Sequence, residues 1–293
     1  GFVTLAFDSL GVGDSSKPEP VERGYALGVE AIARANQAAL AGALRRLAGG
    51  DPASRVPPLV PVASVGIGHS MGSALTVEQQ ALARPHRALV LFSFTTAGVP
   101  RFLSPRQRAL AGDPMRARRE IGALARETLG SPYPERPEGS REDRSAAFGV
   151  GSAPPAATEA LRRASTNLLG TAGLLSMIPG GFTPPADLVD VPVLVALGDG
   201  DLHGVDGLAS MFPRSPNVES FVLEDCRHCH FVAGGRERLW TRVAEWIPAA
   251  LASLPSSEPI LSSDRSALPS SEPIALAPSD PTALPPIDEG DRP

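Results

Sequence analysis

The sequence predicts an α/β protein in which a mostly parallel sheet is flanked by helices. Two observations predict this class: short apolar runs typical of buried strands, and stretches between them with apolar residues at helical spacing. Strands that alternate with helices favour a parallel sheet, because each crossover places a helix on a face of the sheet. The expected strands are 2–7, 62–67, 88–94, 191–197 and 218–223.

The helical patterns support the same architecture. Residues 29–48 and 236–247 each carry an apolar face, the second with Leu239, Trp240, Val243 and Ile247 on it. The chain has 293 residues, of which 42% are hydrophobic, so it can bury one large core.

A serine between two glycines is the third and most informative observation. Residues 68–72 read Gly-His-Ser-Met-Gly and lie between an expected strand and a helical pattern. This is the nucleophile elbow motif, in which a sharp turn needs glycines, and we expect a Cβ at Gly68 or Gly72 to clash. Such a turn exposes the Ser70 hydroxyl and sets the backbone N–H of Met71 beside it as an oxyanion donor. The alternative is a Gly/Ser-rich turn without a chemical role.

The start of the chain strengthens this interpretation. Residues 8–15 read Asp-Ser-Leu-Gly-Val-Gly-Asp-Ser, directly after the first apolar run. An Asp-x-x-Gly-x-Gly-x-Ser turn that precedes Gly-His-Ser-Met-Gly resembles the α/β-hydrolase superfamily, over about residues 1–250. The resemblance implies that Ser70 is a nucleophile and that Asp8 caps backbone donors in its own turn.

The resemblance also implies which strands the chain carries. Strand 2–7 matches the family's fourth strand, so the N-terminal strands one to three are expected to be missing. In the family, the third strand lies between the fourth and fifth, and the loop after it supplies a second oxyanion donor. We therefore expect strand 2–7 either to pair with 62–67 or to leave backbone groups unpaired, in a chain that aggregates and is nearly inactive.

A helical lid is expected between two parts of the core. The segment after Gly98 has no strand pattern but has helical stretches, and the family carries a lid at this point that covers the nucleophile. The end of the chain is rich in Pro, Ser and Ala and has no aromatic residue, which favours disorder. The expected lid helices are 105–111, 114–129, 156–169 and 171–178. The expected division is 1–98 (first part of the core), 99–187 (lid), 188–250 (second part of the core) and 251–293 (disordered tail).

A serine nucleophile needs a base, and the base needs a carboxylate. In the α/β-hydrolase fold the chain order is Ser, acid, His. The family's spacing after strand 191–197 selects Asp201 as the acid, with Asp199 as the alternative. After strand 218–223, the base is His228, with His230 as the alternative.

The segment that holds this histidine also matches another motif. Residues 226–230 read Cys-Arg-His-Cys-His, which is the C-x-x-C-H pattern of c-type haem attachment. Haem attachment needs export and a distal iron ligand, and a zinc site needs further ligands. We therefore expect no metal and no cofactor, and a c-type haem protein remains a remote alternative. His69 is expected to support the elbow by packing, and His86 and His203 to be surface or loop residues.

Composition limits the kinds of partner and the location that are expected for this chain. The net charge of −5 arises in the tail, so the rest of the chain has no bias toward nucleic acid. No apolar run is long enough to span a membrane, and no signal peptide is visible, which favours the cytoplasm. The chain starts at Gly1 rather than Met, so export stays open. The dominance of Arg over Lys, with abundant Ala and Pro, points to a bacterial source.

These observations predict a serine hydrolase that cleaves a small-molecule carboxylic ester or thioester through an acyl-enzyme. The alternative is a degenerate homologue that folds but does not catalyse. The sequence leaves the substrate and the oligomeric state open.

Overall fold

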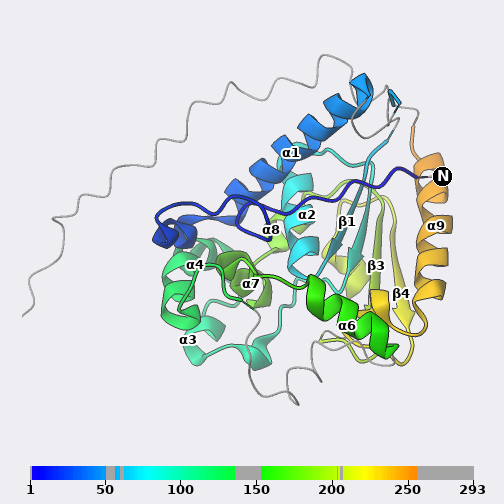
Figure 1. Ribbon diagram of the computed structural model, residues 1–293. Coiled ribbons are helices and arrows are strands. Elements are labelled where there is room, and N and C mark those ends of the chain that lie inside the picture. The colour runs from blue at the N-terminus through cyan, green and yellow to red at the C-terminus, as the bar shows by residue number, and fades with distance from the viewer. Residues whose placement is uncertain are drawn as a thin grey trace, which may run out of the picture. The chain divides into compact units, whose positions relative to one another are not determined.

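A four-stranded parallel sheet organises the chain in the computed structural model, which describes residues 2–50, 57–59, 63–135, 153–202, 204 and 207–255. The strands lie in the order β1-β2-β3-β4, each hydrogen-bonded in parallel to the next (Figure 1). Their bounds are β1 (Val65–His69), β2 (Ala88–Phe92), β3 (Val193–Gly198) and β4 (Val218–Leu223). The expected parallel α/β architecture is confirmed.

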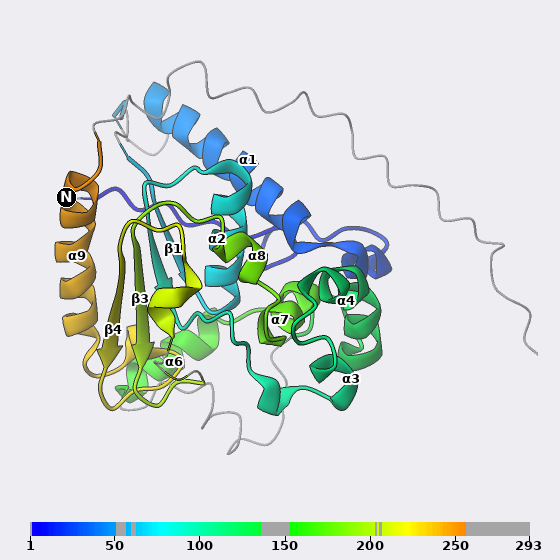
Figure 2. The same ribbon diagram turned by 180° about the vertical axis from the view of Figure 1, so that it is seen from behind.

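Helices cover both faces of this sheet, as Figures 1 and 2 show from opposite sides. Helix α2 follows β1 directly and lies on one face, with α1 beyond it, whereas α9 lies on the other face. The α-helices are α1 (Val29–Gly49), α2 (Met71–Ala83), α3 (Pro105–Arg108), α4 (Pro114–Leu129), α6 (Pro155–Ala164), α7 (Gly170–Met177), α8 (Thr183–Ala186) and α9 (Arg236–Ala252). Short 3₁₀ helices are η1 (Val21–Ala26), η2 (Pro100–Phe102), η3 (Leu208–Met211) and η4 (His230–Val232).

Two hydrophobic cores hold these layers together. Leu89 and Leu91 of β2 point into the core on the α2 side, whereas Val90 and Phe92 point into the core beneath Trp246 of α9. Both faces of the central strands are therefore buried, which is typical of parallel sheets and explains why their sequences are continuously apolar. Within the described residues, no helix is both long and apolar enough to cross a membrane.

Helices α4 and α7 of the insert between β2 and β3 pack on the α2 side. They contribute Leu124 and Leu175 to the same core as the sheet. Arg118 of α4 also donates two hydrogen bonds, of 3.1 and 2.8 Å, to the carboxylate of Glu78 in α2. Their side chains are only 11% and 5% exposed, and breaking a buried pair of this kind is strongly destabilising. The insert is thus fixed to the helix that begins at the serine turn.

Residues 2–7 do not form the expected strand. They run as an extended segment in which Phe2, Val3, Leu5 and Phe7 are between 42% and 65% exposed. A strand exists only through hydrogen bonds to a neighbour, and this segment pairs with none of the described strands. The prediction of a strand at 2–7 is therefore wrong, although the apolar pattern is present.

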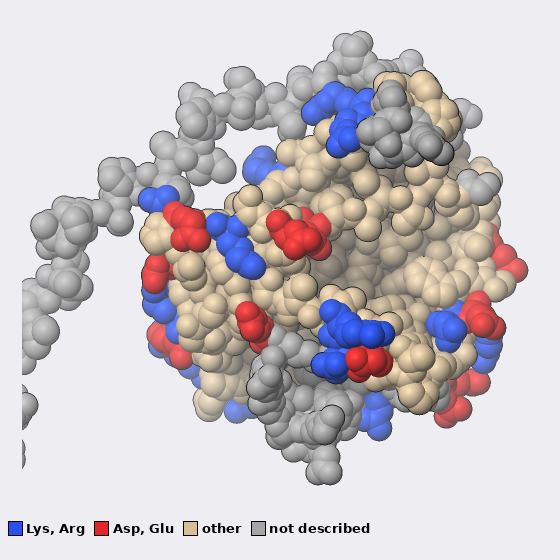
Figure 3. Space-filling model, viewed as in Figure 1, with Lys and Arg blue, Asp and Glu red and all other residues tan. Residues whose placement is uncertain are grey.

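The outer side of β1 is open as a result. Among the described residues, β1 pairs only with β2, and Ile67 at its centre is 48% exposed. Figure 3 shows that the surface is hollowed and almost without charged side chains where Figure 1 places β1. Of the two arrangements expected for this region, the described residues show the unpaired one.

Two element boundaries differ from expectation for a physical reason. Strand β2 ends at Phe92 rather than at 94, because Ser93 has a φ of +52°, which a strand does not accommodate. Helix α9 continues to Ala252, and Leu251 packs against the core beneath it, so residues 251–252 belong to the helix and not to the tail. Residue 62 of the expected strand 62–67, residues 136–152 of the expected lid and residues 256–293 of the expected tail lie outside the described residues.

Candidate active site

The serine motif forms the turn between β1 and α2. Ser70 has a φ of +54°, a conformation that residues with a Cβ adopt rarely and that is often found at functional sites. Its backbone N–H donates to the carbonyl oxygen of Phe92, 2.8 Å away, which ties the turn to the end of β2. A Cβ on Gly68 would lie 2.5 Å from Cα of Ser73, so this position requires glycine.

The second glycine does not have the expected steric role. A Cβ on Gly72 would meet no atom within 4 Å, because it would point into open space, so the expected clash is wrong there. Between the two glycines, Met71 is the first residue of α2. The first N–H groups of a helix have no acceptor within it and carry the positive end of its dipole. The N–H of Met71 therefore belongs to a donor group beside Ser70.

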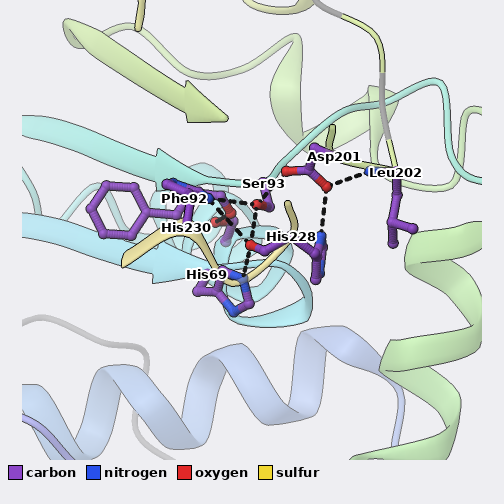
Figure 4. Close-up of polar contacts among 8 residues, drawn as sticks. His69, Phe92, Ser93, Asp201, Leu202, His228 and His230 are labelled. Atoms are coloured by element: carbon purple, nitrogen blue, oxygen red, sulfur yellow. Dashed lines mark hydrogen bonds and ion pairs between the residues drawn. The ribbon is translucent and has the colours of Figure 1, made fainter. Parts of the chain in front are cut away.

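Asp201 and His228 meet where β3 and β4 end (Figure 4). Nδ1 of His228 lies 2.8 Å from Oδ1 of Asp201, and the two side chains are 4% and 0% exposed. An ionised carboxylate can only accept, so Nδ1 of the histidine carries the proton. In the neutral ring, Nε2 is then the basic nitrogen.

Hydrogen bonds keep Asp201 ionised despite its burial. Its Oδ1 also accepts from the N–H of Leu202 at 2.6 Å, and its Oδ2 accepts from the hydroxyl of Ser93 at 2.5 Å. Burial acts to raise the pKa of Asp201, but the hydrogen bond and charge of His228, together with these two donors, lower it to about 2. Asp201 is therefore negative near neutral pH and can stabilise an imidazolium on His228.

The alternative acid, Asp199, ties the two turns together. Its carboxylate accepts from the backbone N–H of Cys226 at 3.0 Å and of Asp225 at 3.1 Å, and these hydrogen bonds lower its pKa. Asp199 thus contacts the backbone of the histidine turn, whereas Asp201 contacts the histidine ring.

Two further histidines surround the carbonyl group of His228. Nε2 of His69 lies 3.0 Å from this carbonyl oxygen, and Nδ1 of His230 lies 3.2 Å from it (Figure 4). Burial lowers the pKa of His69 to about 3, with the nearby His228 acting in the same direction, and burial also lowers the pKa of His230. Both rings are therefore neutral near pH 7. Nδ1 of His230, the alternative base, faces the backbone carbonyl of His228.

His86 lies in the loop between α2 and β2, as expected, but it is buried rather than at the surface. It is 8% exposed, its Nδ1 lies 2.8 Å from the hydroxyl of Ser64, and its backbone N–H donates to the side chain of Gln80. Burial lowers the pKa of His86 to about 4. His203 lies outside the described residues.

The cysteine motif has a buried first thiol. Cys226 is 2% exposed, and its Sγ lies 3.0 Å from the carbonyl oxygens of both Leu223 and Glu224. Burial raises the pKa of Cys226 to about 11, so the thiol is neither accessible nor nucleophilic as haem attachment requires. The part of the chain that the structure describes brings together no group of three His, Cys, Asp or Glu side chains suited to a metal ion.

A cavity brings the serine and the histidine to one place. Its walls include Ser70 from the elbow, His228 from the turn after β4, and Ser176 and Met177 from α7 of the insert. The other lining residues are Ser93, Phe94, Thr95, Val99 and Leu202. Apolar walls with a few hydroxyl groups are typical of sites for small molecules.

Ser93 is the site residue that sequence reasoning missed. It stands inside an expected strand, after five apolar residues that are all buried. The only signal was a hydroxyl group in an otherwise apolar run, next to the edge of the sheet where the acid was expected.

Comparison with known proteins identifies the family of the chain. The sequence profile described as the Alpha/beta hydrolase family matches residues 1–271. The chain belongs to the alpha/beta hydrolase family. Among solved structures, this hydrolase is similar to the monoacylglycerol lipase of Paleococcus ferrophilus, with 17% identity over 84% of this chain and 82% of that chain, and a TM-score of 0.51.

A second similar structure is a thermophilic esterase from Thermogutta terrifontis. It is 19% identical over 83% of this chain and 78% of that chain, with a TM-score of 0.45. At 17% identity, the likeness to the lipase supports the fold alone. No curated protein sequence gives a significant match.

Proposed function

We propose that this hydrolase cleaves a carboxylic ester or thioester through an acyl-enzyme, with Ser70 as nucleophile, His228 as base and Asp201 as the acid that orients the base. The observation that supports the proposal most is the 2.8 Å hydrogen bond between His228 and Asp201 beside a cavity that Ser70 also lines. Family membership makes a hydrolase plausible, and the bond that is cleaved is part of the proposal.

The proposed reaction uses the tautomer described above. Nε2 of His228 removes the proton from Ser70, and the resulting Oγ attacks the carbonyl carbon of the substrate. The N–H of Met71 stabilises the oxyanion of the tetrahedral intermediate. His228 then donates its proton to the leaving alcohol or thiol as that bond breaks. Water, deprotonated by His228, attacks the acyl-enzyme and releases the carboxylic acid and Ser70.

The lining of the cavity favours an uncharged small-molecule substrate. Its apolar walls come from Phe94, Val99, Met177 and Leu202, and apart from His228 the lining residues carry no titratable side chain. A charged acyl group would lose its hydration there without gaining a partner. We propose that residues 99–187 act as the lid of this site, because α7 supplies part of its wall.

A non-catalytic role is the competing function, and the open side of β1 favours it. The loop that supplies a second oxyanion donor in the family would lie on that side, and loss of one donor typically costs about 10²- to 10³-fold in kcat. On this alternative, the protein would bind a ligand in the cavity without turning it over.

A panel of p-nitrophenyl esters and matched thioesters of increasing acyl length tests the proposal. The wild-type protein should hydrolyse uncharged substrates and should be labelled on Ser70 by a fluorophosphonate, located by mass spectrometry. The Ser70→Ala variant should lose both activities while it keeps its fold by circular dichroism. A Ser70→Ala protein with wild-type turnover would reject the assignment, and a folded wild type that is neither active nor labelled would favour the non-catalytic function.

A further inference from the structure

The residue directly after β2 contacts the proposed acid from the side opposite to the histidine. We propose that Ser93 is a positioning residue of this hydrolase, whose hydroxyl fixes the carboxylate of Asp201 and thereby the ring of His228. This inference rests on the proposed function and adds a fourth residue to its machinery.

The two oxygens of the carboxylate have different partners, and Ser93 is the one described for Oδ2. Oδ1 of Asp201 faces Nδ1 of His228, and Oδ2 faces the hydroxyl of Ser93 at 2.5 Å (Figure 4). A carboxylate bonded at one oxygen can swing about its Cβ–Cγ bond, whereas one bonded at both oxygens cannot swing without breaking a contact. Ser93 therefore holds the plane in which His228 receives its hydrogen bond.

Three neighbouring groups could accept the single proton of the Ser93 hydroxyl. Besides Oδ2 of Asp201, the hydroxyl oxygen lies 2.8 Å from the carbonyl oxygen of His228 and 3.2 Å from Nδ1 of His230. The carboxylate is both the nearest acceptor and the charged one, and hydrogen bonds to ionised acceptors are stronger. The carbonyl of His228 also has another donor, Nε2 of His69. The proton of Ser93 therefore points to Asp201.

His230 completes this assignment. With the proton on its Nδ1, His230 donates toward the carbonyl oxygen of His228 and the hydroxyl oxygen of Ser93. Its Nε2 is buried without a hydrogen-bond partner, which fits a bare lone pair better than an N–H group, because buried N–H groups without acceptors are rare. The direction of donation is then from His230 to Ser93 to Asp201.

The backbone conformation of Ser93 indicates that its role in the site depends on its side chain. Ser93 is 1% exposed and has a φ of +52°, in the left-handed region that glycine occupies at least cost. A glycine would therefore suit the turn better than a serine does. What the serine adds is a hydroxyl group aimed at the acid.

The other titratable groups near Asp201 are not expected to complicate the pH dependence of kcat/KM. These groups are His228, His230, His69 and the thiol of Cys226. Burial lowers the pKa of His69 to about 3, lowers the pKa of His230, and raises the pKa of Cys226 to about 11. The acid limb of the kcat/KM profile thus reports on the Asp201–His228 pair.

The Ser93→Gly variant tests the hydroxyl, because glycine suits the backbone and the substitution removes the hydrogen bond to Asp201. We expect kcat/KM and the rate of fluorophosphonate labelling of Ser70 to fall about 10- to 100-fold, without a loss of melting temperature. The acid limb should move to higher pH, since a carboxylate without this donor binds the imidazolium of His228 more strongly. Ser73→Ala is the matched control, because Ser73 is fully buried and donates to Phe92 rather than to the acid. Its acid limb should stay in place.

A readout without turnover separates this proposal from the proposed function. The downfield proton NMR signal of Nδ1–H on His228 should shift or broaden in Ser93→Gly and stay unchanged in Ser73→Ala. An unchanged signal in Ser93→Gly would overturn the positioning role, whether or not the protein turns over esters. So would a loss of kcat without movement of the acid limb, because that pattern belongs to a structural residue. The activity of Ser70→Ala judges the proposed function independently.

Discussion

The acid–base corner, formed by the turns after β3 and β4, and the outer flank of β1 are built in opposite ways. At the corner, a Cβ on Gly198 would lie 2.6 Å from the carbonyl oxygens of both Cys226 and Arg227, so the two turns touch backbone to backbone. At the flank, Ile67 is 48% exposed and residues 2–7 form no strand. Backbone contacts between distant segments hold the corner together. At the flank, no described strand pairs with the outer side of β1.

This difference teaches that the site depends on the closed half of the sheet. The elbow belongs to the strand with the open flank, but its position is set by β2. Both the N–H of Ser70 and the hydroxyl of Ser73 donate to the carbonyl oxygen of Phe92. The acid, the base and Ser93 follow the ends of β3, β4 and β2. The candidate residues can therefore meet although one side of β1 is unpaired.

The largest expected effect lies at the centre of the closed corner. Replacing His228 or Asp201 with Ala should lower kcat/KM by about 10³-fold or more, because members of a triad act as a unit. The matched variants Asp199→Ala and His230→Gln should retain far more activity, since these residues contact the histidine turn rather than the reacting atoms. Steady-state kinetics on one ester checks this ranking. If Asp199→Ala and His230→Gln abolished activity while the His228 and Asp201 variants kept it, the catalytic residues would lie in these two turns but would be Asp199 and His230.

A smaller effect is expected from a single methyl group between the two turns. Gly198→Ala forces a Cβ against two carbonyl oxygens, and overpacking of this kind costs about 2–3 kcal/mol of unfolding free energy. Urea denaturation measures the change. Gly28→Ala is the control, because a Cβ there meets nothing within 4 Å and its stability should be unchanged. Equal stability of both variants would mean that the corner is looser than its contacts indicate.

The pH dependence of stability extends this comparison. The N-terminal end of β1 is covered by packed side chains, whereas its outer side is unpaired among the described residues. His86 packs there, and its pKa is lowered to about 4 from 6.5. The unfolded chain binds this proton near pH 6.5 and the folded chain only near pH 4. Its contribution to stability is therefore complete above pH 6.5 and is lost as the pH falls toward 4.

The variant His86→Gln removes that contribution to the pH dependence. Between pH 7 and pH 5, the wild type should lose about 2 kcal/mol more unfolding free energy than the variant does. Urea denaturation at both pH values measures this difference. Parallel pH dependences for the two proteins would show that His86 titrates normally and is not closed off from water.

The smallest effect on stability is expected at the open flank. Ile67→Ser should change the unfolding free energy by no more than about 0.5 kcal/mol, as exposed substitutions usually do. It should nevertheless reduce the binding of an apolar dye and the self-association of the chain, because exposed apolar patches drive both. Met115→Ser, at a position on α4 that is 56% exposed, is the control. A large loss of stability in Ile67→Ser alone would show that the flank is covered.

Local patterns predicted the sheet where burial on both faces dictates the sequence. Strands β2 and β3 lie within one residue or two of their expected bounds, because continuous apolar runs occur where helices cover both faces. Strand β4 also has the expected bounds, although it is only partly buried. Residues 2–7 have a similar apolar pattern but no strand. Pairing needs a neighbour, and a single segment carries no information about whether its neighbour is present.

The candidate site was predictable in part for the same reason. Asp201 and His228 follow strand ends, and parallel strands bring those ends to one edge, so their meeting could be expected. Ser93 could not be identified, because its partner is 108 positions away and the contact arises only through the register of β2 and β3. The burial of His86 was not predicted, because it depends on Ser64 and Gln80, which contact it only after folding.

The contact between the turns after β3 and β4 has a consequence for how such a site can change over time. Because Gly198 leaves no room beside the carbonyl oxygens of Cys226 and Arg227, a longer or bulkier residue in one turn must be matched by a change in the other. The two turns are therefore expected to diverge together as one heritable unit. A protein engineer who transplants this site onto another scaffold should move residues 198–202 and 224–230 as a single graft.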